Sequence, residues 1–443
     1  MSCLRCAVGI FLLTISVRGF LLSRTSSLDF LYVRRSFPPR SASAGAEAPQ
    51  TEASFLSGDE GINVAISLSQ TKKFADPFIQ PTGPTAHVPP LFPLVTSYVF
   101  RMAGYGNAAA AVRNGLNILG LGLLYASFPF AARALGVAAA SGGIAGILAA
   151  IFPAFRSSEV FRGRDEWAAA LVLLWLTALT YKMCTRAEAR FVDTVVFGLG
   201  WGLLLHIQPS MVAVLPVHGL ILLVYRARIP MKQRLGQGMV AASIVLLVLL
   251  PWTIRNYFAL GAWMFVRDNF GLELRVSHGD GAQPSQAANG RTGWLCAIHP
   301  TCSVAAANEV RRVGEVSFNR QRLHEALAWI SGHPGRVSIL TLARVSAFWA
   351  DLPSNWSTFA VRLLWSLLGW LGLIRMWKAE YRLQAWLFGS VLVFYPLIYY
   401  AVQYSNRYVI AICFAIFLPA GFALHQMYLD LRSNAKGAFW PRT

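Results

Sequence analysis

The most regular feature of the sequence is a series of long apolar stretches separated by short polar turns. A helix needs about 17 to 25 mostly apolar residues to cross about 30 Å of hydrocarbon. The stretches of suitable length predict an all-α polytopic membrane protein with about ten (9–13) transmembrane helices and two long extracytoplasmic segments. The predicted spans are residues 7–23, 114–132, 135–153, 167–183, 191–207, 210–225, 236–254, 361–376, 384–402 and 408–427.

The first apolar stretch also has features of a targeting segment. Arg5 precedes it, as in a signal peptide, but Arg18 interrupts the run and no clear small-residue cleavage site follows. We therefore interpret residues 7–23 as an uncleaved signal-anchor helix.

Lys and Arg gather in every second turn between the spans, for example between residues 226 and 234. Cytoplasmic loops of membrane proteins carry such an excess of basic residues, so the N-terminus is predicted to lie inside. The resulting order is a first span (1–23), an outer loop (24–113), spans two to seven (114–254), an outer segment (255–360), spans eight to ten (361–427) and a cytoplasmic tail (428–443). One outer turn breaks the pattern, which is either an exception or a set of cations kept for an anionic ligand: Arg156, Arg162 and Arg164.

The two outer segments contain shorter apolar runs. Residues 91–103 are too few to span and carry Pro93 in the first turn, and residues 337–349 are interrupted by Arg344. Both runs predict helices that lie along the membrane surface. Residues 36–54 are rich in Ser, Pro and Ala and have few large apolar side chains, so they predict a flexible stretch.

Composition supports a membrane protein and bears on its partners. Of 443 residues, 55% are hydrophobic and 13% are charged, against about 25% charged in an average soluble domain. A net charge of +19 could indicate a nucleic-acid binder, but the basic residues lie between apolar stretches rather than in one stripe. Membrane lipid is therefore an expected partner, and nucleic acid is not.

The six cysteines form neither a CxxC pair nor a His/Cys ligand set, so no metal site is predicted from them. Cys296 and Cys302 share one outer segment and could form a disulfide in an oxidising compartment. Two unpaired thiols are an equal alternative. The sequence requires no cofactor, although carboxylates and phosphate oxygens would suit a divalent cation.

In the predicted topology, polar residues at the outer ends of the spans converge on one surface. Carboxylates there suit general-base activation of a hydroxyl or amine acceptor, and arginines suit a phosphate leaving group. The candidates are Asp59, Glu60, Asp165, Glu166, His206, Arg255, Asn256, Tyr404 and Arg407. The sequence has no nucleotide-binding P-loop, zinc-protease helix or nucleophile elbow.

Each candidate also has a purely structural explanation. The two acidic pairs could be residues that the start of a helix favours. His206 could be a packing histidine near a helix end. The two arginines could be interfacial anchors whose charged ends reach water.

Several motifs follow one another in a characteristic order from about residue 55 onward. They are Asp59-Glu60-Gly61; His87-Val88-Pro89-Pro90-Leu91-Phe92-Pro93; Pro251-Trp252-Thr253-Ile254-Arg255-Asn256-Tyr257; Val266-Arg267-Asp268-Asn269-Phe270-Gly271-Leu272-Glu273; Glu315-Val316-Ser317-Phe318-Asn319-Arg320; Trp329-Ile330; and His333-Pro334-Gly335-Arg336. The set resembles the GT-C class of membrane glycosyltransferases, in particular bacterial relatives of the protein O-mannosyltransferases and the aminoarabinose transferase of lipid A.

The resemblance implies a sugar donor on a polyprenyl phosphate or diphosphate, and an acidic residue of the first outer loop at the reaction centre. Asp59 matches that residue, with Glu60 beside it, and the matching motifs add His87, Arg267 and Glu273 as substrate-binding candidates. The acceptor could be a glycolipid, a glycan or a protein. We therefore expect an inverting, carboxylate-assisted transfer at the extracytoplasmic face of the cytoplasmic membrane.

Two other classes of function stay open. A lipid or sugar transporter or flippase would also be polytopic, but it would place ionisable residues near the bilayer midplane. Here the centres of the spans are almost free of charge. A catalytically inactive relative that acts in membrane assembly would keep the same residues.

Overall fold

The computed structural model describes residues 2–23, 59–151, 165–350 and 356–439. Within these ranges the chain forms α-helices, short 3-10 helices and two isolated β-bridges, and no β-strand. The predicted all-α class is therefore confirmed. Some predictions concern residues outside the described ranges, namely the flexible stretch at 36–54 and the outer cations Arg156, Arg162 and Arg164.

Seven helices of the described residues are long and apolar enough to cross a membrane. They are Cys3–Ser23, Asn107–Ala134, Glu166–Thr185, Met231–Leu260, Phe359–Lys378, Arg382–Ala401 and Asn406–Ser433. The other three predicted spans correspond to the shorter apolar helices Ala139–Ile151, Phe191–Ile207 and Pro209–Tyr225. Each predicted span thus coincides with an apolar helix.

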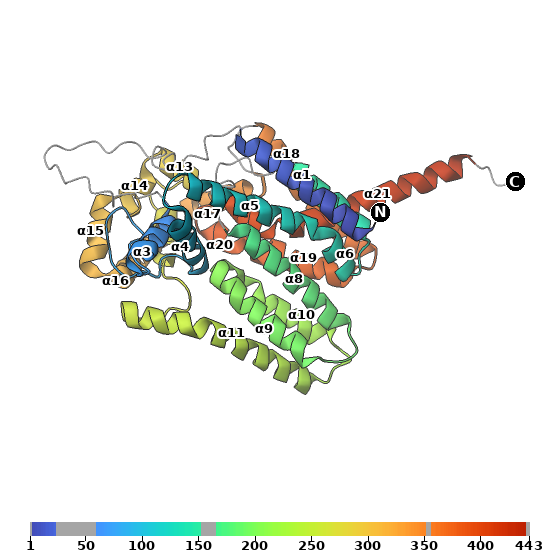
Figure 1. Cartoon of the computed structure of the whole chain (residues 1–443), viewed down its shortest axis with the longest axis horizontal. Coiled ribbons are helices and arrows are strands. Elements are labelled where there is room, and N and C mark those ends of the chain that lie inside the picture. The colour runs from blue at the N-terminus through green and yellow to red at the C-terminus, as the bar shows by residue number, and fades with distance from the viewer. Residues whose placement is uncertain (1, 24–58, 152–164, 351–355, 440–443) are drawn as a thin grey trace.

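Two groups of elements can be distinguished in Figure 1. The bundle contains α1 (Cys3–Ser23), α5 (Asn107–Ala126), α6 (Phe128–Ala134), α7 (Ala139–Ile151), α8 (Glu166–Thr185), α9 (Phe191–Ile207), η2 (Pro209–Ala213), α10 (Leu215–Tyr225), α11 (Met231–Leu260), α18 (Trp356–Lys378), α19 (Arg382–Phe394), α20 (Leu397–Ala401), η3 (Asn406–Ile412) and α21 (Cys413–Phe439). The second group, which we call the cap, contains α3 (Glu60–Thr71), α4 (Leu91–Ala103), α12 (Phe270–Ser277), α13 (Gln286–Arg291), α14 (Trp294–Ile298), α15 (Val304–Val313), α16 (Glu315–Gly332) and α17 (Pro334–Ala350).

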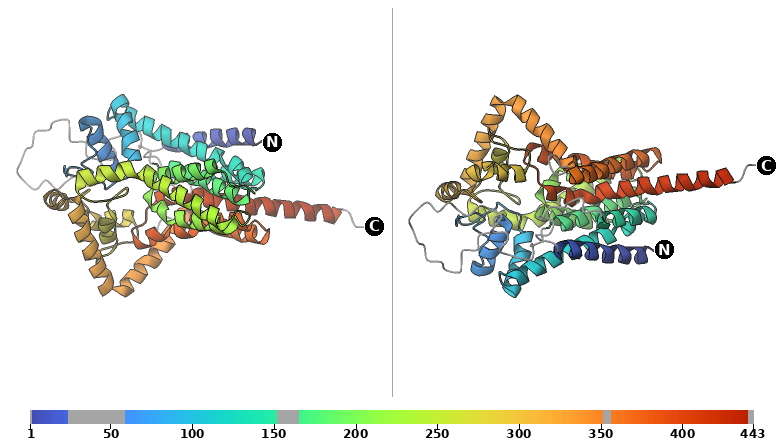
Figure 2. Two further views of the ribbon diagram at one scale, coloured as in Figure 1. Left: turned by 90° about the horizontal axis from the view of Figure 1, so that it is seen from below. Right: turned by 90° about the horizontal axis from the view of Figure 1, so that it is seen from above.

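The cap lies at one end of the bundle, and both ends of the chain lie toward the other end (Figures 1 and 2). The turn between α10 and α11 also lies away from the cap in Figure 1. The predicted division of the chain into outer segments and spans stays a prediction. The side of the membrane that the cap faces stays a prediction.

The two outer segments fold together into one cap. Phe78 of the first segment packs in one apolar cluster with Leu272 and Phe318 of the second. Backbone hydrogen bonds join the segments as well, from Asp268 N to Ala86 O at 2.8 Å. The cap therefore depends on both segments, although they are far apart in the sequence.

The predicted surface helices are present as α4 and α17, and their position on a membrane surface stays a prediction. Arg344, which interrupts the apolar run of α17, is fully buried. Its guanidinium donates hydrogen bonds to Ser277 O of α12 and, at 2.9 Å, to Ala401 O of α20. This charged side chain therefore ties the cap to the bundle.

The bundle contains a buried arginine in α1 and a close contact between two of its helices. Arg18, inside α1, is 1% exposed and donates to Ala149 O of α7 at 3.4 Å. Helices α9 and α11 approach closely at Gly198 and Gly202, where an added Cβ would lie 2.8 Å from Ile244 and 2.6 Å from Val248. Small residues four apart allow such close helix contacts in membranes.

Candidate active site

A cavity of about 410 Å³ lies where the cap meets the ends of the bundle helices. Eight of the twelve predicted site residues line it: Asp59, Glu60, His87, Asp165, Glu166, Arg267, Glu273 and Arg407. Five of them are acidic and two are arginines. Acidic and cationic groups from segments far apart in the sequence are thus brought to one chamber at the end of the bundle.

Asp59 is fixed at the cavity wall by the backbone of α3. It is the N-cap of that helix, and its Oδ1 accepts hydrogen bonds from Gly61 N at 3.0 Å and Ile62 N at 3.3 Å. The side chain is 4% exposed. The helix-start explanation of this aspartate therefore holds, and the same contacts orient its carboxyl group at the cavity.

Glu60 joins the first outer segment to a short disulfide loop. Its Oε1 accepts a hydrogen bond from Thr301 Oγ1 at 2.6 Å. Thr301 lies in the loop closed by the disulfide between Cys296 and Cys302. Of the two alternatives for these cysteines, the structure shows the disulfide.

The same loop carries His299, which faces His87 with ring centroids 5.7 Å apart. Ligand atoms of Glu60, His87 and His299 all lie within 4.8 Å of one another. Both histidines are buried, and His87 Nδ1 has no hydrogen-bond partner among the described residues. Imidazole nitrogens and a carboxylate oxygen are the donor types that Zn²⁺ favours.

The protonation state of His87 fits a ligand role. Burial lowers the pKa of its ring well below the ordinary value, and the nearby His299 and Arg267 lower the pKa further. The ring is therefore neutral near pH 7, and a neutral imidazole is the form that binds a metal ion. No spacing motif predicts this trio, because Glu60 and His87 lie far apart in the first outer segment and His299 lies in the second.

The two arginines lie in different walls. Arg267 donates from Nε to His87 O at 3.2 Å, and this contact leaves its Nη1 and Nη2 for a ligand. Arg407 Nη1 lies 3.4 Å from Glu166 Oε1 and its guanidinium lies over the ring of Tyr408. Both cations line the cavity and are held in place by these contacts.

Other lining residues build the polar wall. Glu273 accepts hydrogen bonds from Asn269 and Gln403, both at 3.2 Å, so its carboxylate is engaged within the protein. Asp165 precedes α8 and makes no side-chain cap bond to that helix. For this residue the helix-start explanation gains no support from the described contacts.

Four predicted site residues do not line the cavity. His206 contacts Val248 O of α11 at 3.1 Å, and Tyr404 donates to Asn406 Oδ1 at 2.8 Å. Arg255 donates to Thr85 O at 2.6 Å and Phe74 O at 2.7 Å, and the neighbouring Asn256 donates to Met264 O at 3.1 Å. The contacts of His206, Arg255 and Asn256 are to backbone carbonyls, which is a structural role, and the Tyr404 contact is local.

Several lining residues were not among the predicted site residues. Gln208 donates to Tyr399 OH at 2.9 Å and Ser210 Oγ at 3.0 Å, and the ring of Tyr399 stacks on Tyr408 at a centroid distance of 4.0 Å. His299 was also missed. The sequence signal that could have indicated His299 is its place between two cysteines six residues apart, because a disulfide would hold the residues of such a short loop rigidly.

The fold and the cavity define an all-α polytopic membrane protein with a polar chamber where the cap meets the ends of the bundle helices. Among solved structures, the chain is similar to archaeal oligosaccharyltransferase AglB from Archaeoglobus fulgidus in complex with an inhibitory peptide and a dolichol-phosphate. The TM-score is 0.51 at 13% identity, and the alignment covers 99% of this chain and 52% of AglB. The AglB complex with Zn and sulfate gives a TM-score of 0.52 at 13% identity, with 95% and 49% covered.

The chain thus spans about half the length of the AglB structures, and at this identity the likeness shows a shared fold. ArnT from Cupriavidus metallidurans in the apo state aligns over 82% of this chain and 72% of its own, with 16% identity and a TM-score of 0.32. That score is below the level of a common fold. No protein-family model and no curated protein sequence matches the chain.

Proposed function

We propose that the protein is a membrane glycosyltransferase that moves a sugar from a polyprenyl-phosphate carrier to an acceptor on the extracytoplasmic face. The main support is the cavity at the end of the bundle, where five acidic side chains meet two arginines. An acid can activate an acceptor, and arginines can receive a departing phosphate. A cavity next to membrane helices suits a donor whose carrier stays in the bilayer.

The proposed roles follow from the contacts. Asp59 is the candidate base, since two backbone N–H groups hold its carboxyl group at the cavity wall. Arg267 and Arg407 are the phosphate candidates, because both line the cavity. Arg255 was expected to share that role, but its guanidinium is directed to the carbonyls of Thr85 and Phe74. Arg267 therefore takes its place.

A divalent cation fits the same site. Glu60, His87 and His299 would hold it, and a bound cation would add positive charge to a chamber in which acidic groups outnumber arginines. One AglB neighbour was crystallised with Zn, which supports a search for that metal first. The protein residues alone already provide the base and phosphate candidates.

Two observations support a lipid-linked sugar donor and a site on the extracytoplasmic side of the membrane. An AglB neighbour is in complex with a dolichol-phosphate, which is a lipid-linked phosphate. The Cys296–Cys302 disulfide lies in the cap, and disulfides persist in oxidising compartments outside the cytoplasm. The acceptor class is left open, since the chain matches only half of AglB.

The test is ligand stabilisation of the purified full chain in detergent. A polyprenyl-phosphate sugar should raise the melting temperature in a saturable manner, because a ligand that binds only the folded state stabilises it. A nucleotide sugar with the same sugar should have no effect. Stabilisation by the nucleotide sugar alone would overturn the proposed donor, and transfer of labelled sugar to membrane acceptors would establish the reaction.

A further inference from the structure

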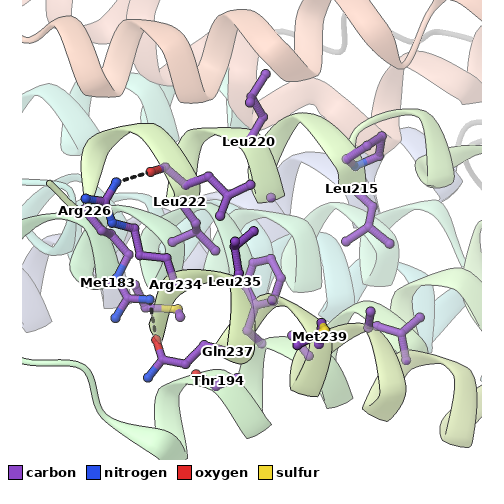
Figure 3. A pocket seen from close by; sticks show the side chains of 18 residues that line it. Met183, Thr194, Leu215, Leu220, Leu222, Arg226, Arg234, Leu235, Gln237 and Met239 are labelled. Atoms are coloured by element: carbon purple, nitrogen blue, oxygen red, sulfur yellow. Dashed lines mark hydrogen bonds between the residues drawn. The ribbon is translucent and has the colours of Figure 1, made fainter. Parts of the chain in front are cut away.

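A second cavity, of about 560 Å³, lies between α9, α10 and α11 at the end of the bundle away from the cap. Its lining is almost wholly apolar, apart from a polar group at one end. Figure 3 shows Arg226, Arg234, Gln237 and Thr194 gathered there, with Leu215 toward the opposite end. The cavity is therefore amphipathic along its length, and it shares no lining residue with the candidate active site.

The space exists because glycines line two of its walls. Helix α11 packs tightly on α9 through Gly198 and Gly202, as described above. In contrast, a Cβ added to Gly219 of α10 or to Gly238 of α11 would meet no atom within 4 Å. Both glycines line the cavity, so the missing side chains leave a groove between α10 and α11.

The apolar part of the groove opens toward the outer surface of the bundle. Three of its lining side chains are strongly exposed: Leu220 at 58%, Leu235 at 49% and Met239 at 68%. These residues belong to helices that are predicted to span the membrane. Their exposed surface therefore faces acyl chains, and a hydrocarbon chain can enter from the bilayer without crossing water.

The polar end has unmet hydrogen-bonding capacity. Arg226 is 4% exposed and donates from Nη1 to Gln237 Oε1 at 2.6 Å, but its buried Nε has no partner among the described residues. Thr194, at 1% exposed, likewise has no partner there for its Oγ1. Buried polar atoms of this kind normally find a partner.

The charge at this end is positive. Arg234 donates hydrogen bonds to the carbonyls of Leu223 and Ile229. Because these N–H groups are used within the protein, Arg234 would attract a ligand mainly through its positive charge. Asp193 is the acidic side chain that acts on Arg226, and it is already paired with Arg186 at 2.6 Å and Lys182 at 3.7 Å. Arg226 and Arg234 therefore keep a net attraction for an anion.

We infer that this groove is a binding site for an anionic diacyl phospholipid of the membrane. One acyl chain lies in the apolar groove between α10 and α11. The phosphate accepts hydrogen bonds from Arg226 and Thr194 and is attracted by Arg234. The site is independent of the glycosyltransferase proposal and lies at the predicted cytoplasmic end, where anionic lipid headgroups attract basic residues.

The test uses the delipidated full chain in a neutral detergent, with dioleoyl phosphatidylglycerol and dioleoyl phosphatidylcholine as probes. Native mass spectrometry should show one tightly retained phosphatidylglycerol per chain and little retained phosphatidylcholine. Phosphatidylglycerol should also raise the melting temperature in a saturable manner. Equal retention of the two lipids would overturn the inference, as would displacement of phosphatidylglycerol by a polyprenyl phosphate.

Matched variants locate the site. Gly238→Leu should abolish retention by filling the groove, whereas Gly236→Leu should bind normally, because that glycine also has open space but does not line the groove. Arg226→Gln should weaken binding about fivefold, the effect of about 1 kcal/mol for one basic residue near a membrane surface. Lys232→Gln, an exposed cation in the first turn of α11, is its control. Equal binding by Gly238→Leu and Gly236→Leu would refute the assignment even if Arg226→Gln fails to fold.

Discussion

Glu166, at the start of α8, lies 3.4 Å from Arg407 in η3, although 241 residues separate them in the sequence. The pair joins two walls of the candidate active site, and Glu166 is 6% exposed. A buried charge that loses its partner keeps the cost of its desolvation. The geometry therefore predicts that the two side chains are energetically coupled.

We expect Arg407→Gln and Glu166→Gln each to lower the melting temperature, and the double variant to lose less than the sum. Direct neighbours typically couple by about 0.5 to 3 kcal/mol. Thermal unfolding of the four proteins in one detergent measures the coupling. Strictly additive effects would show that the pair makes no net contribution.

The histidine and glutamate trio predicts bound metal. Elemental analysis of the dialysed protein should find about one Zn²⁺ per chain, and His87→Ala or His299→Ala should reduce that content several-fold, since a ligand is lost. His324→Ala, an exposed histidine of α16, is the control and should retain the metal. If the unaltered protein binds none of Zn²⁺, Mn²⁺ and Mg²⁺, the trio is only a packed polar cluster.

Glu315 predicts a pH dependence of stability. It accepts hydrogen bonds from Thr85 Oγ1 at 2.5 Å and Ala86 N at 2.7 Å, and burial raises its pKa from 4.5 to about 7. The folded state therefore keeps a proton that the unfolded chain releases above pH 4.5. This contribution to stability is complete below pH 4.5 and is lost as the pH rises to about 7, by about 3 kcal/mol.

Glu315→Gln should remove most of this decrease of stability with rising pH, because the amide stays neutral. Melting temperatures between pH 4.5 and 8 measure it, and Glu188→Gln, an exposed acid in the turn before α9, should leave the slope unchanged. Burial also raises the pKa of Asp268 to about 6, so a smaller slope of the same sign should remain. An unchanged slope in Glu315→Gln would assign the pH dependence to other groups.

The fold was largely predictable because apolar length is a strong signal. A stretch such as residues 236–254 has few alternatives to a membrane helix, and it lies within α11. The cap was less predictable. Its helices α12 to α15 are short, and contacts such as Phe78 with Phe318 depend on pairing segments that are remote in the sequence. Only α4 and α17 had an apolar run that indicated a helix.

The site shows the same limit at the level of single residues. Topology places residues at the correct end of a helix, but the direction of each side chain around the axis depends on packing. His206 and Gln208 are two residues apart, yet His206 contacts α11 and Gln208 faces the cavity. Arg255 was a reasonable phosphate candidate by position, and only its contacts with Thr85 and Phe74 show the structural role.

The orientation of the chain can be measured by cysteine labelling. In a background without Cys3 and Cys6, a cysteine at Ala287 in the cap should react with an impermeant reagent from outside intact cells. A cysteine at Lys232, in the first turn of α11, should react only after permeabilisation, because basic segments at this end stay inside. Labelling of both positions from the same side would refute the predicted topology.

The most informative single substitution is Asp59→Asn. Asparagine is as good an N-cap as aspartate, so its side-chain oxygen can still accept from Gly61 N and Ile62 N. The fold should survive, and the melting temperature should change little. The negative charge and the proton acceptor are lost, however, and loss of general-base help costs about 10² to 10⁴ in rate.

Glu60→Gln is the matched control, since glutamine can still accept from Thr301 Oγ1. It should lose less activity than Asp59→Asn if Asp59 is the base, and more if the neighbouring acid is. Product formed from a polyprenyl-phosphate sugar is compared at equal membrane abundance of each variant. Near-normal product from Asp59→Asn would remove Asp59 from the mechanism, and normal product from both variants would leave the cavity without its proposed base.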